Sequence, residues 1–250
     1  MIPSLNRQYA RAHKYIVKTI LSTFTKGITV LDVGCGGGTI LLNLAHSLKL
    51  NSKSMLIGLD IDVEKLHELK KASEKISLKN IAVILASAER LPIRDRSVDI
   101  LVCTHVLEHI KDDETGWRET IRVLTEKGFY WFAAPRPLLR VSPIHIPLMW
   151  FMGRGVGHVR SGYMTSDVIC KFKKNGFKIL AIFDNPDLIY FLLYQYPYAL
   201  MSLINCMLGK HNYEGQGLSQ IKNLALKLED CLPSLPQFGS GYTVVATKLS

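Results

Sequence analysis

Short apolar segments alternate with amphipathic segments along the first 135 residues, and this alternation restricts the possible folds more than any other feature. The apolar segments are nearly continuous, which is typical of strands buried on both faces. Strands that alternate with helices form parallel βαβ units. The predicted strands are 28–33, 55–60, 81–86, 98–103 and 128–134, and the predicted helices are 6–24, 39–48, 63–73 and 112–124.

The pattern changes after residue 135 and then returns. A helix is predicted at 165–174, a strand at 177–183 and a last strand at 242–248, with two inserts at 136–164 and 185–238. The last strand has to rejoin the first sheet, so a linear two-domain chain does not fit. We therefore predict a doubly wound α/β fold, one domain over 1–250, in which the inserts form a lid over the substrate.

One loop carries the strongest signal for a ligand. The sequence Val30-Leu31-Asp32-Val33-Gly34-Cys35-Gly36-Gly37-Gly38-Thr39 runs from a buried strand through glycines at alternate positions into a helix. Glycine permits positive φ and a close approach of a ligand to the backbone. The dinucleotide pattern G-x-G-x-x-G needs a glycine where Thr39 stands, and no Gly-Lys-Ser/Thr of a P-loop follows.

The loop instead resembles motif I of the class I S-adenosylmethionine (SAM)-dependent methyltransferases, an acid followed by alternating glycines. Because SAM has no phosphate, the protein loop that binds it needs space for the ligand more than it needs donors for an anion. The resemblance implies SAM as cofactor and a seven-stranded, mostly parallel Rossmann-like sheet of order 3-2-1-4-5-7-6. It places Asp32 near the amino group of SAM and Asp60, which ends a strand, on the ribose hydroxyls, while Asp62 caps the next helix.

The resemblance continues through residues 85–92, 97–110 and 122–128, and it is strongest for the type 11 branch that contains the ubiquinone and menaquinone biosynthesis methyltransferases. Ser87 stands where related enzymes often carry an acid that binds adenine, and Lys127 replaces a glycine. No metal site is expected. The residues that the resemblance assigns to SAM are Asp32, Gly34, Cys35, Gly36, Gly38, Asp60, Ile61, Ser87, Ala88 and Thr104.

The inserts differ from the rest of the chain in charge and hydropathy. The segment 136–184 holds eight Lys and Arg against two Asp, and no charged residue occurs from Leu188 to Gly209. The uncharged run is long enough to span a membrane, but Gln195, Pro197 and Asn205 interrupt it. We expect a lid over an apolar pocket, with contact at a membrane surface as the alternative and a span as the least favoured one.

Four side chains are candidates for removing a proton from the methyl acceptor, and one of them, His145, lies in the first insert. His105 follows the fourth predicted strand, and His158 and Tyr163 precede the helix at 165–174. A neutral imidazole can accept a proton from a hydroxyl group. Each histidine can equally be structural, as we expect for His109, because many methyltransferases need only proximity and alignment of their substrates.

The function we expect is methyl transfer to a small, apolar or lipid-like acceptor such as a quinol or isoprenoid. The net charge of +10 keeps an RNA methyltransferase open as an alternative, although no Asn-Pro-Pro-Tyr motif or Pro-Cys pair supports it. A non-catalytic SAM-binding protein is a further alternative. The five cysteines show no C-x-x-C spacing, and no apolar signal segment begins the chain, so we expect a cytoplasmic protein, peripheral to a membrane at most.

Overall fold

The computed structural model describes residues 7–23, 27–48, 53–137, 159–160, 162–184 and 241–249. The chain divides into two compact units. The first comprises Met1–Ala134, Tyr163–Phe183 and Thr243–Ser250, and the second comprises Pro135–Gly162 and Asp184–Tyr242. The second unit corresponds closely to the two predicted inserts, and the single domain stays a prediction.

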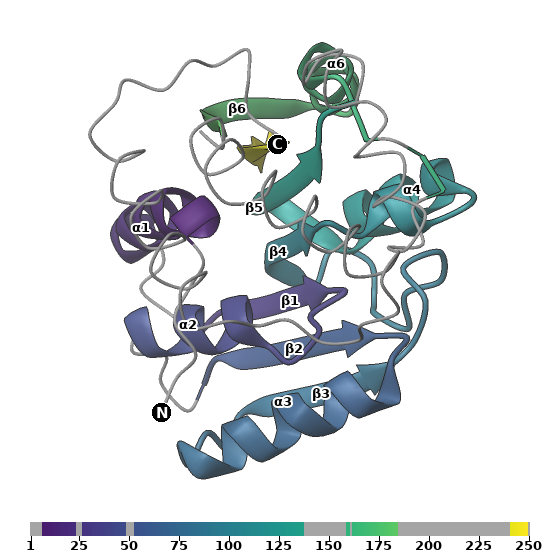
Figure 1. Cartoon of the computed structure of the whole chain (residues 1–250). Helices are drawn as coiled ribbons and strands as arrows, with labels where there is room; N and C mark the ends of the chain where they lie inside the picture. Colours follow the sequence, from purple (N-terminus) through teal and green to yellow (C-terminus); the bar gives the residue numbers. More distant parts are fainter. Residues whose placement is uncertain are drawn as a thin grey trace, which may run out of the picture. The chain divides into compact units, whose positions relative to one another are not determined.

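Seven strands form one sheet in the order β3-β2-β1-β4-β5-β7-β6, which confirms the predicted order (Figure 1). Strand β1 pairs in parallel with β2 and β4, and β3 and β5 extend the sheet in parallel beside them. The elements are α1 (Arg7–Thr23), β1 (Thr29–Val33), α2 (Thr39–Ser47), β2 (Met55–Asp60), α3 (Val63–Lys75), β3 (Ile81–Leu85), β4 (Val98–Thr104), the 3-10 helix η1 (Leu107–His109), α4 (Asp113–Val123), β5 (Leu124–Pro135), α6 (Thr165–Lys174), β6 (Phe177–Asp184) and β7 (Gly241–Lys248).

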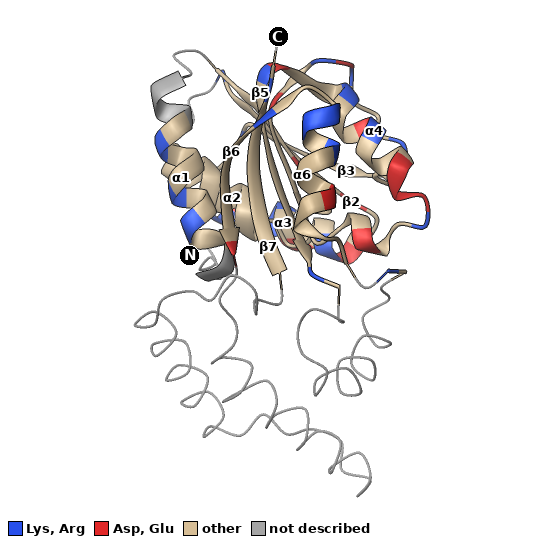
Figure 2. Cartoon of the chain, turned by 90° about the horizontal axis from the view of Figure 1, so that it is seen from above, with Lys and Arg blue, Asp and Glu red and all other residues tan. Residues whose placement is uncertain are grey.

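Helices cover both faces of this sheet. Successive side chains of a strand point to opposite faces, so each central strand packs against helices on both sides. In β5, Phe129 and Trp131 belong to a core cluster with residues of α1, α2 and α3. Tyr130 and Phe132 alternate with them and pack against Trp117 of α4 and against α6. Figure 2 shows α1 and α2 on one side of the strands and α4 and α6 on the other. This arrangement is the predicted doubly wound fold.

The described residues of the second unit lie at the ends of its two segments. Arg136 forms an ion pair with Asp184, and both side chains are largely shielded from solvent. The guanidinium carbon of Arg136 also lies 5.4 Å from the centre of the Tyr242 ring. A cation over an aromatic face and an ion pair both fix the planar guanidinium, so Arg136 holds the described ends of these two segments together.

The largest difference from the predicted elements is the start of β5. It begins at Leu124, directly after α4, whereas the sequence predicted its start at residue 128. Val98 pairs with Leu124 and Ile100 with Phe129, so an irregularity separates the two pairings. Within it Lys127 adopts φ +61°, the left-handed conformation that glycine adopts freely, at the position where the resembling enzymes carry glycine.

None of the described helices is long and apolar enough to cross a membrane. The uncharged run 188–208 lies outside the described residues, so its role as a lid stays a prediction.

Candidate cofactor site

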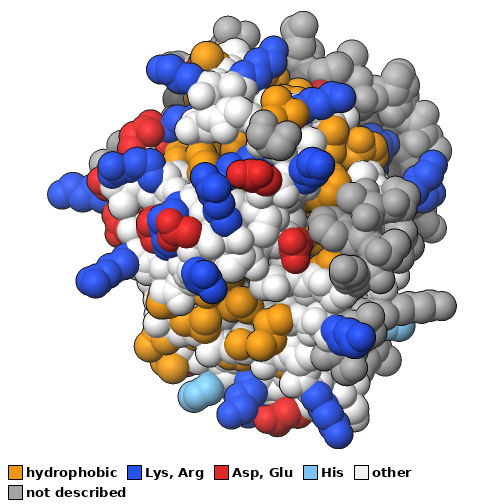
Figure 3. Space-filling model, turned by 180° about the vertical axis from the view of Figure 1, so that it is seen from behind, with side chains coloured by type: hydrophobic (Ala, Val, Ile, Leu, Met, Phe, Trp, Pro, Cys, Tyr) orange, Lys and Arg blue, Asp and Glu red, His pale blue; other side chains and the backbone are white. Residues whose placement is uncertain are grey.

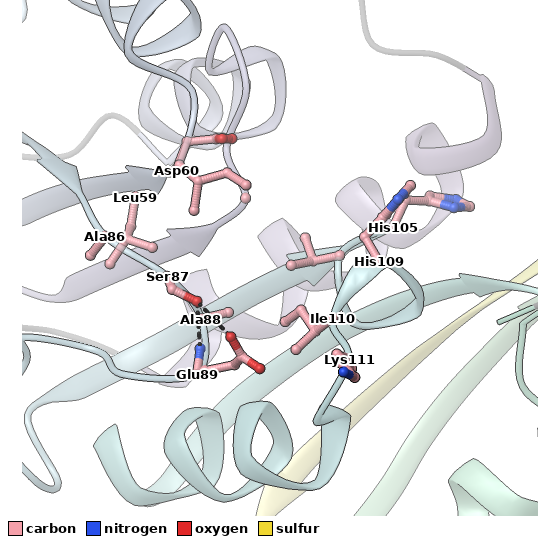
Figure 4. A pocket seen from close by; sticks show the side chains of 13 residues that line it. Leu59, Asp60, Ala86, Ser87, Ala88, Glu89, His105, His109, Ile110 and Lys111 are labelled. Carbon is pink, nitrogen blue, oxygen red and sulfur yellow. Dashed lines mark hydrogen bonds between the residues drawn. The ribbon is translucent and has the colours of Figure 1, made fainter. Parts of the chain in front are cut away.

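A cavity of about 330 Å³ opens at the carboxyl ends of β1, β2 and β4, where ligands of doubly wound sheets bind. Its volume lies at the lower end of the range for small-molecule sites. Figure 4 shows Asp60 on one side, the turn after β3 below, and the segment after β4 on the opposite side. The lining residues are Gly34, Leu59, Asp60, Ile61, Ala86, Ser87, Ala88, Glu89, His105, Val106, His109, Ile110 and Lys111.

The three alternating glycines of the loop after β1 all have positive φ, at +68°, +50° and +80° for Gly34, Gly36 and Gly38. A Cβ at Gly34 would lie 2.2 Å from Val106, and one at Gly38 would lie 2.2 Å from Leu69. These two glycines are therefore required by packing within the protein. A Cβ at Gly36 would meet no atom within 4 Å, so the backbone there faces open space.

Asp60 ties this loop to β2. Its Oδ2 accepts a hydrogen bond of 2.8 Å from the Gly36 N–H, and its Oδ1 accepts one of 3.0 Å from the Asp62 N–H. Asp62 in turn accepts from the Glu64 and Lys65 N–H groups and caps α3, which confirms the role predicted for it. Because a carboxylate offers about four acceptor positions, Asp60 retains capacity for ligand hydroxyl groups.

Asp32 is buried at the end of β1, with 2% of its surface exposed. Burial and, to a smaller extent, the negative charge of Asp60 together raise the pKa of its carboxyl group to about 8, while a backbone hydrogen bond at Leu41 opposes the shift. A cation placed beside Asp32 would favour the ionised carboxylate. The amino group of SAM is such a cation, so this residue fits the predicted cofactor.

Two further features suit a nucleoside. Ile61 lines the cavity with 75% of its surface exposed, which is unusual for so apolar a side chain. In the turn after β3, the Ser87 hydroxyl accepts from the Glu89 N–H at 3.2 Å and donates to the Glu89 carboxylate at 3.3 Å. Glu89 was not singled out from the sequence, yet it supplies a carboxylate beside the serine that replaces the expected acid.

His105 stands where β4 opens into the cavity. It has φ +55°, and its N–H donates to the Ala133 carbonyl at 2.9 Å. Its Nδ1 lies 3.1 Å from Oε1 of Glu108. The Tyr9 ring of α1 meets the His105 ring edge-on, with centroids 6.3 Å apart. Burial raises the pKa of the Tyr9 hydroxyl well above its usual value, although a hydrogen bond with Thr104 opposes the shift.

Several assigned residues are not among the lining residues of the cavity, namely Asp32, Cys35, Gly36, Gly38, Thr104 and Tyr163. The Tyr163 hydroxyl donates to Asp113 at 2.8 Å, and His158 is not among the described residues. The Cys35 thiol points to the Gly36 carbonyl, and burial raises its pKa well above the usual value. Sequence reasoning missed Tyr9, Glu89 and Glu108, and it gave His109, which lines the cavity, a structural role.

The fold and this site together define a class I SAM-dependent methyltransferase. The family model of the methyltransferase domain matches residues 24–148, which is half of the chain. The chain therefore belongs to the methyltransferase domain family.

Several known proteins are similar to the chain. A ubiquinone/menaquinone biosynthesis C-methyltransferase of Rickettsia prowazekii is 37% identical over 101 residues, which cover 40% of this chain and 41% of that protein. A malonyl-[acyl-carrier protein] O-methyltransferase of Marinomonas is 31% identical over 164 residues, which cover 64% of this chain and 57% of that protein. The YcgJ protein of Bacillus subtilis has the same fold, with a TM-score of 0.61 at 17% identity over 96% of this chain and 99% of that one. The chain thus spans only about two fifths of the first of these relatives.

Proposed function

We propose that the protein transfers a methyl group from SAM to a small, apolar or lipid-like acceptor. The observation that carries the donor half is Asp60, which lines the cavity beside a glycine loop whose central residue faces open space. Two features support the acceptor half: the uncharged run in the second insert and the basic stretch before it. The names of the Rickettsia and Marinomonas relatives, which refer to quinone biosynthesis and to an acyl carrier, agree with such an acceptor.

Each residue of the site has a distinct task in this proposal. SAM, when bound, supplies a methyl group that is already activated by its sulfonium charge. Asp60 accepts hydrogen bonds from the ribose, Asp32 attracts the amino group, and Ile61 covers the base. His105 accepts the proton of the acceptor hydroxyl. The protein otherwise acts by holding the acceptor in line with the methyl group.

The decisive assay uses SAM with a labelled methyl group and three acceptors: a lipid extract, total RNA, and a para-quinol with one isoprenyl group. We expect label in the lipid extract or in the quinol. Label in RNA alone would replace this proposal with an RNA methyltransferase. Calorimetric binding of SAM without label in any acceptor would favour the non-catalytic alternative.

We expect the affinity for SAM to rise with pH because of Asp32. The pKa of this carboxyl group is about 8 in the folded protein, so below that pH it is mostly protonated and attracts the SAM amino group weakly. Between about pH 6 and pH 8 the affinity should increase by up to about tenfold per pH unit. Calorimetry of the parent and of Asp32→Asn separates this effect from the titration of SAM itself. Equal slopes in the two proteins would contradict the assignment.

We also propose a membrane-surface contact, carried by α1. Its residues Arg11, Lys14 and Lys18 are exposed and recur three and four positions apart, which places them on one face of the helix. The helix contains no acidic residue, and no ion pair between described residues involves these three. On the face that Figure 3 shows, by contrast, Lys and Arg lie among Asp and Glu. Elsewhere in the described part of the chain, Lys171 pairs with Glu114 and Arg122 with Glu119. The α1 face is complementary to anionic lipid.

Replacing two of these cations tests the contact. Lys14→Glu with Lys18→Glu should lower binding to anionic phosphatidylglycerol vesicles at least tenfold, because each cation near such a surface contributes about 1 kcal/mol. Lys70→Glu with Lys71→Glu, on exposed positions of α3, makes the same change in net charge elsewhere. Co-sedimentation measures both. Equal losses in the two variants would show that only net charge matters, and the α1 contact would be wrong.

A further inference from the structure

Glu108 is a wholly buried carboxyl group to which the proposed function gives no task. It lies on η1 with 0% of its surface exposed. One oxygen, Oε1, is 3.1 Å from Nδ1 of His105, and the other, Oε2, has no hydrogen-bond partner among the described residues. Burying a carboxylate costs several kcal/mol unless a partner compensates for lost water. A leucine would fill the same space without that cost, so core packing does not explain Glu108.

The partner of this carboxyl group is held in a strained position at the cavity. His105 has φ +55°, which residues with a Cβ rarely adopt, and the 2.9 Å hydrogen bond from its N–H to Ala133 keeps it there. Tyr9 packs edge-on against its ring. The backbone, the carboxyl group and the tyrosine thus fix the imidazole from three directions. Strain of this kind is found where a functional group must be held in place.

The 3.1 Å contact has a chemical consequence for the ring. A carboxylate oxygen in this contact accepts a hydrogen bond, so the contact favours the tautomer that carries its proton on Nδ1. The neutral ring then has its lone pair on Nε2. When an acceptor hydroxyl gives up its proton, the O–H bond breaks, the proton binds Nε2, and the electron pair remains on oxygen. The carboxylate stabilises the imidazolium so formed, as in serine hydrolases.

We propose that Glu108 is a positioning residue that fixes the Nδ1–H tautomer of His105 and thereby makes Nε2 the base of the methyl transfer. The assignment of Nε2 as the base rests on the proposed function, whereas the assignment of the tautomer does not. His105 directly follows β4, and Glu108 lies three residues later in η1. A single local turn therefore brings the two side chains together.

The tautomer can be measured directly in the protein without SAM or acceptor. In ¹⁵N-histidine-labelled protein, long-range ¹H–¹⁵N correlations at a pH where imidazole is neutral should show His105 protonated on Nδ1. Glu108→Gln should invert the tautomer, because an amide N–H can donate to Nδ1. Glu119→Gln, which removes a different carboxylate from α4, should leave the His105 signals unchanged. A proton on Nε2 in the parent protein would overturn the proposal, and this readout stands even if Glu108→Gln does not fold.

Kinetics with the isoprenyl quinol then separates this proposal from the proposed function. Glu108→Gln should lower kcat by about 10²-fold or more while the Kd for SAM stays within about twofold. In a His105→Ala background the same change should have no further effect on kcat, because Glu108 acts only through His105. An additional loss in that background would show a merely structural role. The expected tautomers with unchanged kcat would instead refute His105 as the base and leave the positioning intact.

Discussion

Replacing Asp60 with asparagine should weaken SAM binding at least tenfold, a loss of about 1.4 kcal/mol. The carboxylate already accepts hydrogen bonds from the Gly36 and Asp62 N–H groups and lines the cavity where we place the ribose. An asparagine side chain keeps one acceptor oxygen and replaces the other with a donor, so it cannot serve both backbone groups and two hydroxyls. Calorimetric titration with SAM measures the change.

Asp62 provides a matched control two residues away. Asp62→Asn makes the same chemical change on a residue that caps α3, and asparagine caps helices about as well as aspartate. Its affinity for SAM should equal that of the parent. If a folded Asp60→Asn protein binds SAM as tightly as Asp62→Asn does, the ribose lies elsewhere and the assignment of Asp60 is wrong.

The features that sequence reasoning located correctly are those set by local chain chemistry. Buried apolar runs and intervening helices gave the elements, and the resemblance gave the strand order that the sheet has. Asp62 was expected to cap a helix because it precedes a helical pattern, and it does. The start of β5 was predicted too late, because Thr125–Lys127 were interpreted as a loop. In the structure these residues belong to the strand, at an irregularity in its pairing where Lys127 has positive φ.

The residues that sequence reasoning missed come together only through folding. Tyr9 is one apolar position of an amphipathic helix until α1 packs across the sheet and brings it against His105. Glu108 reads as an ordinary acid until the 3-10 turn buries it. Glu89 had one available signal: an acid two residues after the serine that replaces the expected acid. Whether Glu89 can replace the expected acid depends on the conformation of the turn between Ser87 and Glu89, which residue spacing alone does not determine.

The glycines of the loop after β1 share one pattern in the sequence but serve two purposes in the structure. Gly34 and Gly38 are fixed by contacts with Val106 and Leu69, so larger residues there would disturb packing. A Cβ at Gly36 would meet no atom within 4 Å, so packing within the protein does not require glycine there. Substitutions at the outer glycines therefore report on folding, and a substitution at Gly36 reports on binding.

Gly36→Val should abolish measurable SAM binding while the protein remains folded. The side chain would occupy the space beside the Asp60 carboxylate, and it would also strain a backbone with φ +50°. Gly176→Val isolates the strain, because Gly176 has φ +75°, is equally free of neighbours within 4 Å and lies between α6 and β6, away from the loop that is bonded to Asp60. Thermal unfolding should show similar destabilisation of the two variants, on the order of 1–3 kcal/mol. Calorimetry should then show SAM binding in Gly176→Val alone. Comparable affinity in both folded variants would mean that the open space at Gly36 does not receive the cofactor.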